Sequence, residues 1–294
     1  LLRHHYFPEN RILRDITGFD SVTSSVAGGQ DNANTMHVSW ASGIPYAFAL
    51  LRFGARVGDS ACEDAGRTIL DCCSEAVAPA GVFYPAWKEG QGWSGQKAVS
   101  RTAGEAVLFL ARAVLFEHAR GVIHPTWTQA VLANARYAVE TQREDGSFGY
   151  SYDPQTGEVL EWRGSGGVIW VPALLAVADF PDAREFRERA IAAALKAGRY
   201  YQSFVDQEYL FGAPEDVFLT GTSEDGYNAL AAFIALYQHD HSTDWLRTAK
   251  RAAEWTMTFR FGYDIHFSDR TLLGRYQFHT AGGDIASPCN THIH

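Results

Sequence analysis

Two adjacent carboxylic acids, Glu224 and Asp225, stand at the head of an apolar segment in the sequence GTSEDGYNALAAFIALY. The N-terminus of a helix stabilises negative charge, so an acid pair at this position can donate a proton or activate a water molecule. The pair also follows Thr222 and Ser223, and this order is typical of a capping box that only stabilises the helix start. The sequence leaves both interpretations open.

Other long loops carry acids beside aromatic rings. Asp31 stands among three amide side chains, and Glu161 lies between a leucine and a tryptophan, where burial would raise the pKa of a carboxylic acid toward that of a general acid. A sugar stacks its CH faces on aromatic rings, while its hydroxyls need donors and acceptors. The predicted catalytic residues are therefore Glu224, Asp225, Asp31 and Glu161. The predicted substrate-binding residues are Trp87, Trp93, Trp162, Arg163, Tyr227, Arg275, Tyr276, His279 and His292.

Each of these residues also has a plainer interpretation. Acids beside glycine are common in turns, and a tryptophan in a loop is often a packing plug. His37, His279 and His292 can act as acids or bases near neutral pH, but a single histidine is more often structural. The repetition of the same residue types at successive loops favours a carbohydrate site over unrelated turns.

Motifs for other chemistries are missing from the sequence. There is no HExxH, no phosphate loop, no dinucleotide fingerprint and no GxSxG, and the four cysteines form no CxxC pair. We therefore expect no metal and no cofactor. The net charge of -9 argues against a nucleic-acid partner, and no apolar run reaches the roughly 18 residues that would span a membrane. The opening LLRHHYFPEN resembles no secretory signal, so both a cytoplasmic and a secreted location stay open.

The elements that must position these residues repeat along the chain. Small-residue turns recur at a spacing of roughly 60 residues, at Ser42-Gly43, Ala103-Gly104, Gly166-Gly167, Gly226 and Ala286. The first four turns lead into IPYAFALLRF, EAVLFLARAVLF, VIWVPALLAVADF and YNALAAFIALY, which predict buried inner helices. Amphipathic segments follow at 61–77, 125–142, 182–205 and 243–259, and these predict outer helices with one wet face.

An alternation of buried and half-buried helices at a fixed period predicts an all-α fold, a toroid of helical hairpins. We expect six hairpins in the full protein. Four are complete in this sequence, and a fifth inner helix is expected to begin near Ala286, so the last hairpin is incomplete here. Residues 1–40 are predicted to be a lead-in with substrate-loop character, and residues 41–294 the toroid domain. The loops that enter the inner helices should gather at one mouth of the ring.

The units GSGGVIWVPALLAV and GTSEDGYNALAAFIALY and the terminal GGDIASPCNTHIH resemble the six-hairpin glycosidase superfamily from about residue 40 onward. The nearest resemblance is to uronic-acid-processing hydrolases, including unsaturated glucuronyl hydrolases. It implies hydrolysis of a glycosidic bond by two carboxylic acids, one that protonates the leaving oxygen and one that activates water. In that scheme the proton donor is Glu224 or Asp225 and its partner is Asp31 or Glu161. A uronate would be held by Arg163 or Arg275.

Three alternatives stay open. A polysaccharide lyase on a related toroid would remove a proton beside a uronate and would make Tyr276, His279 and His292 central. A sugar epimerase would use a pair of histidines. A non-catalytic carbohydrate-binding toroid would keep the aromatic platforms without using the acids, since a fold does not determine a function.

Overall fold

The structure is a computed structural model that describes residues 2–14, 35–40, 42–214 and 218–285. Its main body consists of helices that pair into four hairpins. The inner helices are α2 (Gly43–Val57), α4 (Ser100–Ala119), α6 (Trp170–Ala178) and α8 (Ser223–Asp240). The outer helices are α3 (Ser60–Ser74), α5 (Pro125–Thr141), α7 (Arg184–Asp206) and α9 (Thr243–Met257). Short helical turns are α1 (Leu2–His5), η2 (Gly166–Ile169), η3 (Pro181–Ala183) and α10 (Leu272–Arg275).

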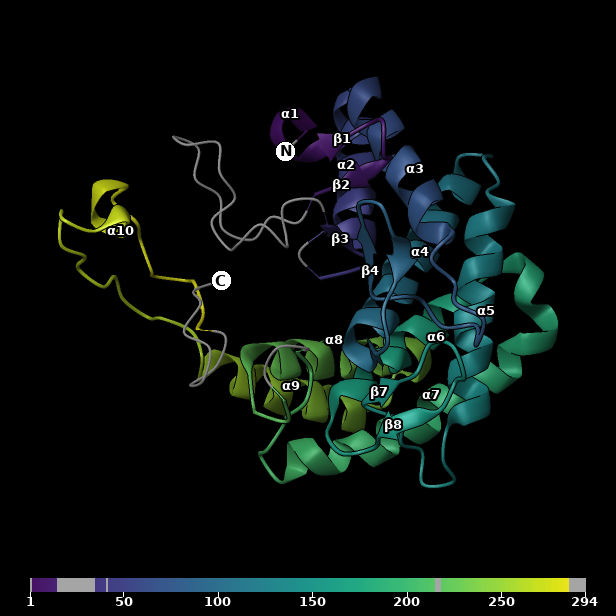
Figure 1. The fold of residues 1–294 in the computed structure, drawn as a ribbon. Helices are drawn as coiled ribbons and strands as arrows, with labels where there is room; N and C mark the ends of the chain where they lie inside the picture. The colour runs from purple at the N-terminus through teal and green to yellow at the C-terminus, as the bar shows by residue number, and fades with distance from the viewer. Residues whose placement is uncertain (1, 15–34, 41, 215–217, 286–294) are drawn as a thin grey trace.

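The hairpins follow one another around an arc (Figure 1). Along the inner side α2 packs on α4, α4 on α6 and α6 on α8, while α3, α5, α7 and α9 form the outer side in the same order. Each inner helix also packs on the outer helix that follows it in sequence. This alternation confirms the predicted all-α toroid of helical hairpins. No helix among the described residues is long and apolar enough to cross a bilayer.

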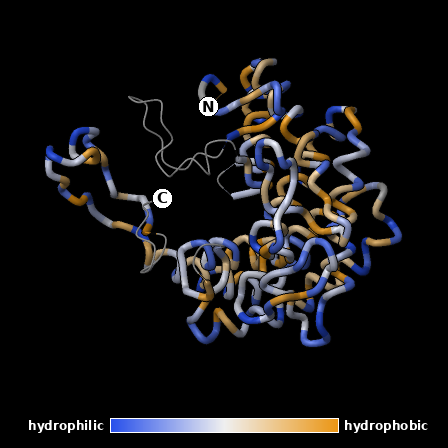
Figure 2. The backbone as a smooth tube through the Cα atoms, viewed as in Figure 1, coloured by the Kyte–Doolittle hydropathy of each residue, from blue (hydrophilic) through white to orange (hydrophobic). Residues whose placement is uncertain are grey.

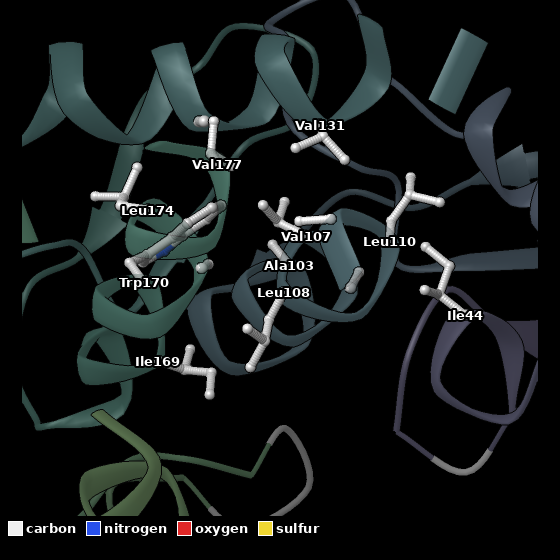
Figure 3. Close-up of a cluster of buried hydrophobic side chains, with 14 of the residues drawn as sticks. Ile44, Ala103, Val107, Leu108, Leu110, Val131, Ile169, Trp170, Leu174 and Val177 are labelled. Carbon is white, nitrogen blue, oxygen red and sulfur yellow. The ribbon is translucent and has the colours of Figure 1, made fainter. Parts of the chain in front are cut away.

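The core lies between the inner and outer helices. Val107 of α4, Trp170 and Leu174 of α6 and Val131 of α5 point into one cluster (Figure 3), and all four are fully buried. Every residue of α6 except Ala176 is buried, as a helix that is apolar on all sides requires. Figure 2 shows the hydrophobic stretches gathered within this helical body.

Two of the inner helices begin earlier than predicted. Ala103-Gly104 and Gly226 lie inside the first turns of α4 and α8, not in the turns that precede them. A β-carbon on Gly104 would come within 2.6 Å of Ile169 Cγ2, and one on Gly226 would collide with Thr256 Oγ1. These glycines therefore allow close packing between neighbouring elements, which produces the same small-residue signal as a turn.

Short antiparallel strands border the inner helices. The described sheets are β1 (Tyr6–Phe7) with β2 (Ile12–Leu13), β3 (Thr35–His37) with β4 (Ala86–Lys88) and β5 (Gly92–Ser94), and β6 (Ala98–Val99) with β7 (Ser151–Tyr152) and β8 (Val159–Glu161). The register places Trp87 opposite both Met36 and Trp93, and Val99 opposite Ser151. Because β3, β6 and β8 directly precede α2, α4 and η2, the sheets lie where the chain enters the inner helices.

Two peripheral segments complete the described chain. After α9, residues 258–285 form an arm that carries α10 and extends away from the helical body (Figure 1). Near the N-terminus Ile12 and Leu13 are buried, and Arg11 forms an ion pair with Glu75 at the end of α3. The fifth inner helix expected near Ala286 and residues 15–34 of the lead-in lie outside the described residues. The domain division at residue 40 stays a prediction.

Candidate functional site

A buried arginine connects the first turns of α4 and α8. Arg101, the second residue of α4, is only 7% exposed. Its Nε lies 3.1 Å from Oε2 of Glu224 on α8, and its Nη1 lies 3.4 Å from Oε2 of Glu105, one turn further along α4. Two carboxylates face one guanidinium, so loss of Arg101 would leave buried charges uncompensated, whereas loss of one acid leaves Arg101 paired with the other. We call Arg101, Glu105 and Glu224 the arginine cluster.

The loop that enters α2 closes over Glu105. Oε2 of Glu105 accepts hydrogen bonds from the Ser39 hydroxyl and, at 3.2 Å, from the backbone N–H of Trp40. Trp40 has a φ of 68°, a left-handed conformation that is an outlier for so bulky a residue. Local strain of this kind persists only where surrounding contacts enforce it. The bond to Glu105 is one such contact, and it brings a third inner helix to the cluster.

Glu224 keeps one oxygen for a further partner. Its Oε2 is buried and lies close to Arg101, yet the two are not aligned as a hydrogen bond, and no described residue donates one to that oxygen. Buried polar atoms in native proteins are nearly always hydrogen-bonded to protein or water. Glu224 Oε2 is an exception to this rule within the part of the chain that the structure describes.

Tyr227 lies beside the cluster on α8. It is 38% exposed, and desolvation of the phenol raises its pKa, with the charge of Glu105 adding to the rise and that of Arg101 opposing it. The charge on Glu224 raises the pKa of Tyr227 as well. An aromatic ring thus stands next to the two carboxylates, as a sugar site requires.

Asp225 points away from the cluster and caps α8. Its Oδ2 accepts from the backbone N–H and the hydroxyl of Thr222, at 2.9 and 2.7 Å, and its Oδ1 accepts from the N–H of Ala213 at 2.8 Å. Burial raises the pKa of Asp225 to about 7, against the lowering effect of these hydrogen bonds. The capping-box interpretation of the acid pair is thus confirmed for Asp225, and a catalytic role for Glu224 stays a prediction.

Glu161 has an environment opposite to the predicted one. Hydrogen bonds from Arg163, including one of 2.6 Å from Nη2 to Oε2, lower its pKa to about 2. The expected rise in its pKa is wrong, because β8 holds the carboxylate against a guanidinium instead of burying it among apolar groups. The neighbouring Trp162 has the Arg143 guanidinium 3.6 Å above its ring, so one of its faces is covered.

The two other predicted tryptophans form a pair in the β4–β5 hairpin. Trp87 faces Trp93 across the strands, and Trp93 donates a hydrogen bond of 3.0 Å from Nε1 to the Cys72 carbonyl on α3. Both rings are half-buried and pack against the core. These contacts anchor the hairpin on the first hairpin of the arc.

The remaining predicted residues lie elsewhere. Arg275, Tyr276 and His279 are exposed on the arm, where His279 Nδ1 lies 3.0 Å from Asp264 Oδ2. Figure 1 shows α10 well separated from the helical body, so the arm does not bring these side chains to the arginine cluster. Asp31 and His292 lie outside the described residues.

Sequence reasoning missed Arg101 and Glu105. Glu105 opens the segment EAVLFLARAVLF, which by itself predicts only an apolar inner helix, and Arg101 precedes the turn expected at Ala103-Gly104. The available signal was an arginine and a glutamate four residues apart at the start of a buried helix, where each charge needs a partner. Within the part of the chain that the structure describes, no group of three His, Cys, Asp or Glu side chains is placed to hold a metal ion.

No family model matches the sequence, and no curated protein matches it. In structure the chain is similar to D-mannose isomerase, with a TM-score of 0.60 and 11% identity over 90% of this chain and 72% of that one. It is also similar to the unsaturated glucuronyl hydrolase of Bacillus sp. GL1, with a TM-score of 0.52 and 13% identity over 81% and 68%. A UGL variant with dGlcA-Glc-Rha-Glc has a TM-score of 0.52 and 13% identity over 75% and 61%.

These likenesses show the fold. The neighbours are (α/α)6 toroids, so they agree with the predicted architecture, a toroid of helical hairpins. The chain spans 61% to 72% of the length of these three neighbours.

Proposed function

We propose that this chain is an enzyme that hydrolyses a glycosidic bond in an oligo- or polysaccharide, with Glu224 and Glu105 as its two carboxylic acids. The observation that carries the proposal is the arginine cluster, in which acids from α4 and α8 meet at one guanidinium where the chain enters the inner helices. The names of the structural neighbours, an isomerase of mannose and a hydrolase of glucuronyl groups, support a carbohydrate substrate.

The different surroundings of the two acids suggest their roles. Glycoside hydrolysis needs one protonated acid and one carboxylate. Glu105 accepts hydrogen bonds from Ser39 and Trp40 and lies 3.4 Å from Arg101 Nη1, so these contacts fix the orientation of its carboxyl group. We therefore assign Glu105 to the activation of water. Glu224, whose Oε2 has no described hydrogen-bond donor, is assigned to protonation of the leaving oxygen.

A uronic acid is the narrower version of this substrate. The similar hydrolase from Bacillus sp. GL1 is described as responsible for the degradation of glycosaminoglycan. A uronate on this chain would need a guanidinium near the cluster, and Arg163 is already paired with Glu161. Arg112 is exposed on α4 and close enough to lower the pKa of Tyr227, so we propose it as the uronate partner.

The test is an assay of the purified chain with mannobiose, maltotriose, cellotriose and an unsaturated chondroitin disaccharide. Reducing ends and the ultraviolet absorbance of unsaturated products are followed together. We expect new reducing ends, and we expect Glu224→Gln to lower the rate by about 10²-fold or more with an unchanged melting temperature. Equal turnover by the Glu224→Gln variant would remove Glu224 from the mechanism. Saccharide binding without turnover would indicate a non-catalytic toroid.

Aldose–ketose isomerisation is a second candidate. This reaction needs a base that removes a proton beside a carbonyl, and the cluster offers two carboxyl groups beside Arg101 for that role. The likeness to D-mannose isomerase adds weight to this candidate. Conversion of free mannose to a ketose, with no cleavage of any oligosaccharide, would favour it over hydrolysis. Elimination is the third chemistry. Two of the residues predicted for it, Tyr276 and His279, lie on the arm, which extends away from the helical body.

A further inference from the structure

One buried asparagine next to the cluster has no hydrogen-bond partner among the described residues. Asn228 on α8 is 0% exposed, and neither its Oδ1 nor its Nδ2 forms a hydrogen bond with any of them. Glu224 Oε2, one helical turn away, also lacks a described hydrogen-bond donor, although it lies 3.1 Å from Arg101 Nε in an ion pair. Leaving a buried amide unpaired is unfavourable, so an amide in this state indicates a position whose partner comes from outside the fold.

The two side chains share one face of α8. Residues four apart in a helix lie above one another, so Asn228 is next to Glu224 along the helix surface. The direction of that face follows from the ion pair, because Glu224 contacts Arg101 on α4. α8 also packs on η2 and α6, and both of these elements pack on α4. The amide, without a described hydrogen-bond partner, therefore lies one turn from the cluster on the buried side of α8.

A second buried asparagine, Asn134, has a structural role, and both polar atoms of its amide are hydrogen-bonded. Asn134 on α5 is also 0% exposed, but its Oδ1 accepts from the Phe83 N–H at 2.8 Å and its Nδ2 donates to the Ala130 carbonyl at 2.9 Å. The fold thus satisfies a buried amide at one site and leaves another unsatisfied beside its reactive acid.

We propose that Asn228 and Glu224 together bind two neighbouring hydroxyl groups of the sugar, which makes Asn228 a positioning residue for the proposed reaction and so rests on that proposal. With the acidic proton of Glu224 on Oε1, its Oε2 only accepts hydrogen bonds, whereas an amide both donates and accepts. One hydroxyl donates to Glu224 Oε2, and the adjacent hydroxyl accepts from Asn228 Nδ2 and donates to its Oδ1. The ligand class is therefore a sugar with adjacent free hydroxyls, with Tyr227 available for stacking.

The experiment compares Asn228→Leu with the matched control Asn134→Leu, using the wild-type chain and whichever saccharide of the hydrolysis panel it cleaves. Leucine has a similar volume and no polar atoms. Asn228→Leu should keep or raise the melting temperature, because it removes an unpaired amide, and should lower kcat/KM by about 10-fold or more. Asn134→Leu should lower the melting temperature, because the Phe83 N–H loses its acceptor, and should leave kcat/KM unchanged well below that temperature.

A deoxy form of the same saccharide gives a second measurement. Replacing the hydroxyl that meets Asn228 should lower kcat/KM for the wild-type chain by about as much as Asn228→Leu does, and should cost the variant almost nothing more. Unchanged kcat/KM in Asn228→Leu would overturn the assignment, and so would a fall in melting temperature equal to that of Asn134→Leu. A wild-type chain that binds no saccharide contradicts the proposed function itself. A wild-type chain that cleaves one beside an equally active Asn228→Leu contradicts only the role of Asn228.

Discussion

Helix α4 carries a buried glutamate near each end, Glu105 at the N-terminal end and Glu117 at the C-terminal end, and their surroundings differ. Glu117 accepts from Arg67 Nε at 2.7 Å and from Arg120 Nη1 at 2.9 Å, and its Oε2 lies 3.2 Å from His124 Nε2. These contacts lower the pKa of Glu117 although desolvation opposes them. Around Glu117 the fold supplies more cations and donors than the carboxylate needs.

At the N-terminal end of α4 the carboxylates outnumber the cations, because Glu105 and Glu224 share the guanidinium of Arg101. Oε2 of Glu224 has no described hydrogen-bond donor, and the Asn228 amide one turn away has no described partner. The same residue types thus form a closed network in one place and an open one in the other. A closed network can only stabilise the fold, whereas an open one retains the capacity to bind.

The largest effect that would sharpen this contrast is expected from Glu105→Gln. The amide keeps the shape of the side chain and can still accept from Ser39 and Trp40, but it cannot take a proton from water. We expect the rate on the cleaved saccharide to fall by about 10²-fold or more with little change in melting temperature. Turnover within a few-fold of wild type would show that Glu105 only orients Arg101.

Glu117→Gln, on the same helix, should act on stability. Breaking a buried ion-pair network by removing one partner costs on the order of 3 kcal/mol, and Glu117 is 0% exposed. We expect urea denaturation to show a loss of this size, with the rate per folded molecule unchanged. A Glu117→Gln variant that is as stable as wild type but inactive would contradict the proposal that the two ends of α4 have different roles.

Asp225→Asn should have a smaller effect that depends on pH. The pKa of Asp225 is raised to about 7 in the folded chain, above the ordinary value of about 4 for an unfolded aspartate. Folding therefore takes up a proton between these values, and the stabilisation from Asp225 is complete below about pH 4 and lost as the pH rises through about 7. Asparagine removes this slope and weakens the cap by about 1 kcal/mol. Urea unfolding of both chains between about pH 4 and 7 measures this pH dependence. If the free energy of unfolding of the wild type rises with pH relative to that of Asp225→Asn, the raised pKa of Asp225 is wrong.

The smallest effect is expected from Glu161→Gln. Glu161 pairs with an exposed arginine, Arg163, and exposed ion pairs contribute little to stability. We expect an unchanged melting temperature and a rate within about 2-fold of wild type. A large loss of rate would return Glu161 to the list of catalytic residues and weaken the assignment of Glu105.

The fold was largely readable from the sequence because its signals are periodic. Inner segments such as VIWVPALLAVADF are apolar on every side, and each precedes an amphipathic outer segment, so burial on both faces was visible in composition. The exact helix starts were not readable, because Gly104 and Gly226 serve packing between elements rather than turns.

The site was readable only in part. The sequence predicts Glu224 and Asp225 together because both precede an apolar run. That signal cannot separate the two acids, because the direction of Asp225 depends on the distant N–H of Ala213. The cluster also needs the pairing of α4 with α8, and contacts of that sequence separation leave no local pattern. That Asn228 has no hydrogen-bond partner among the described residues is visible only in the three-dimensional structure.

The hydrogen bond between Asp225 and Ala213 makes one backbone amide a reporter of the whole site. The Ala213 N–H is held by the residue next to Glu224, so its solvent exchange requires the start of α8 to separate from the preceding loop. Amide hydrogen exchange at Ala213 therefore measures how often the start of α8, with Glu224, moves away from the preceding loop in the absence of substrate. A ligand that bridges Glu224 and Asn228 should slow that exchange, while the amide of Phe83, held by Asn134, keeps its rate.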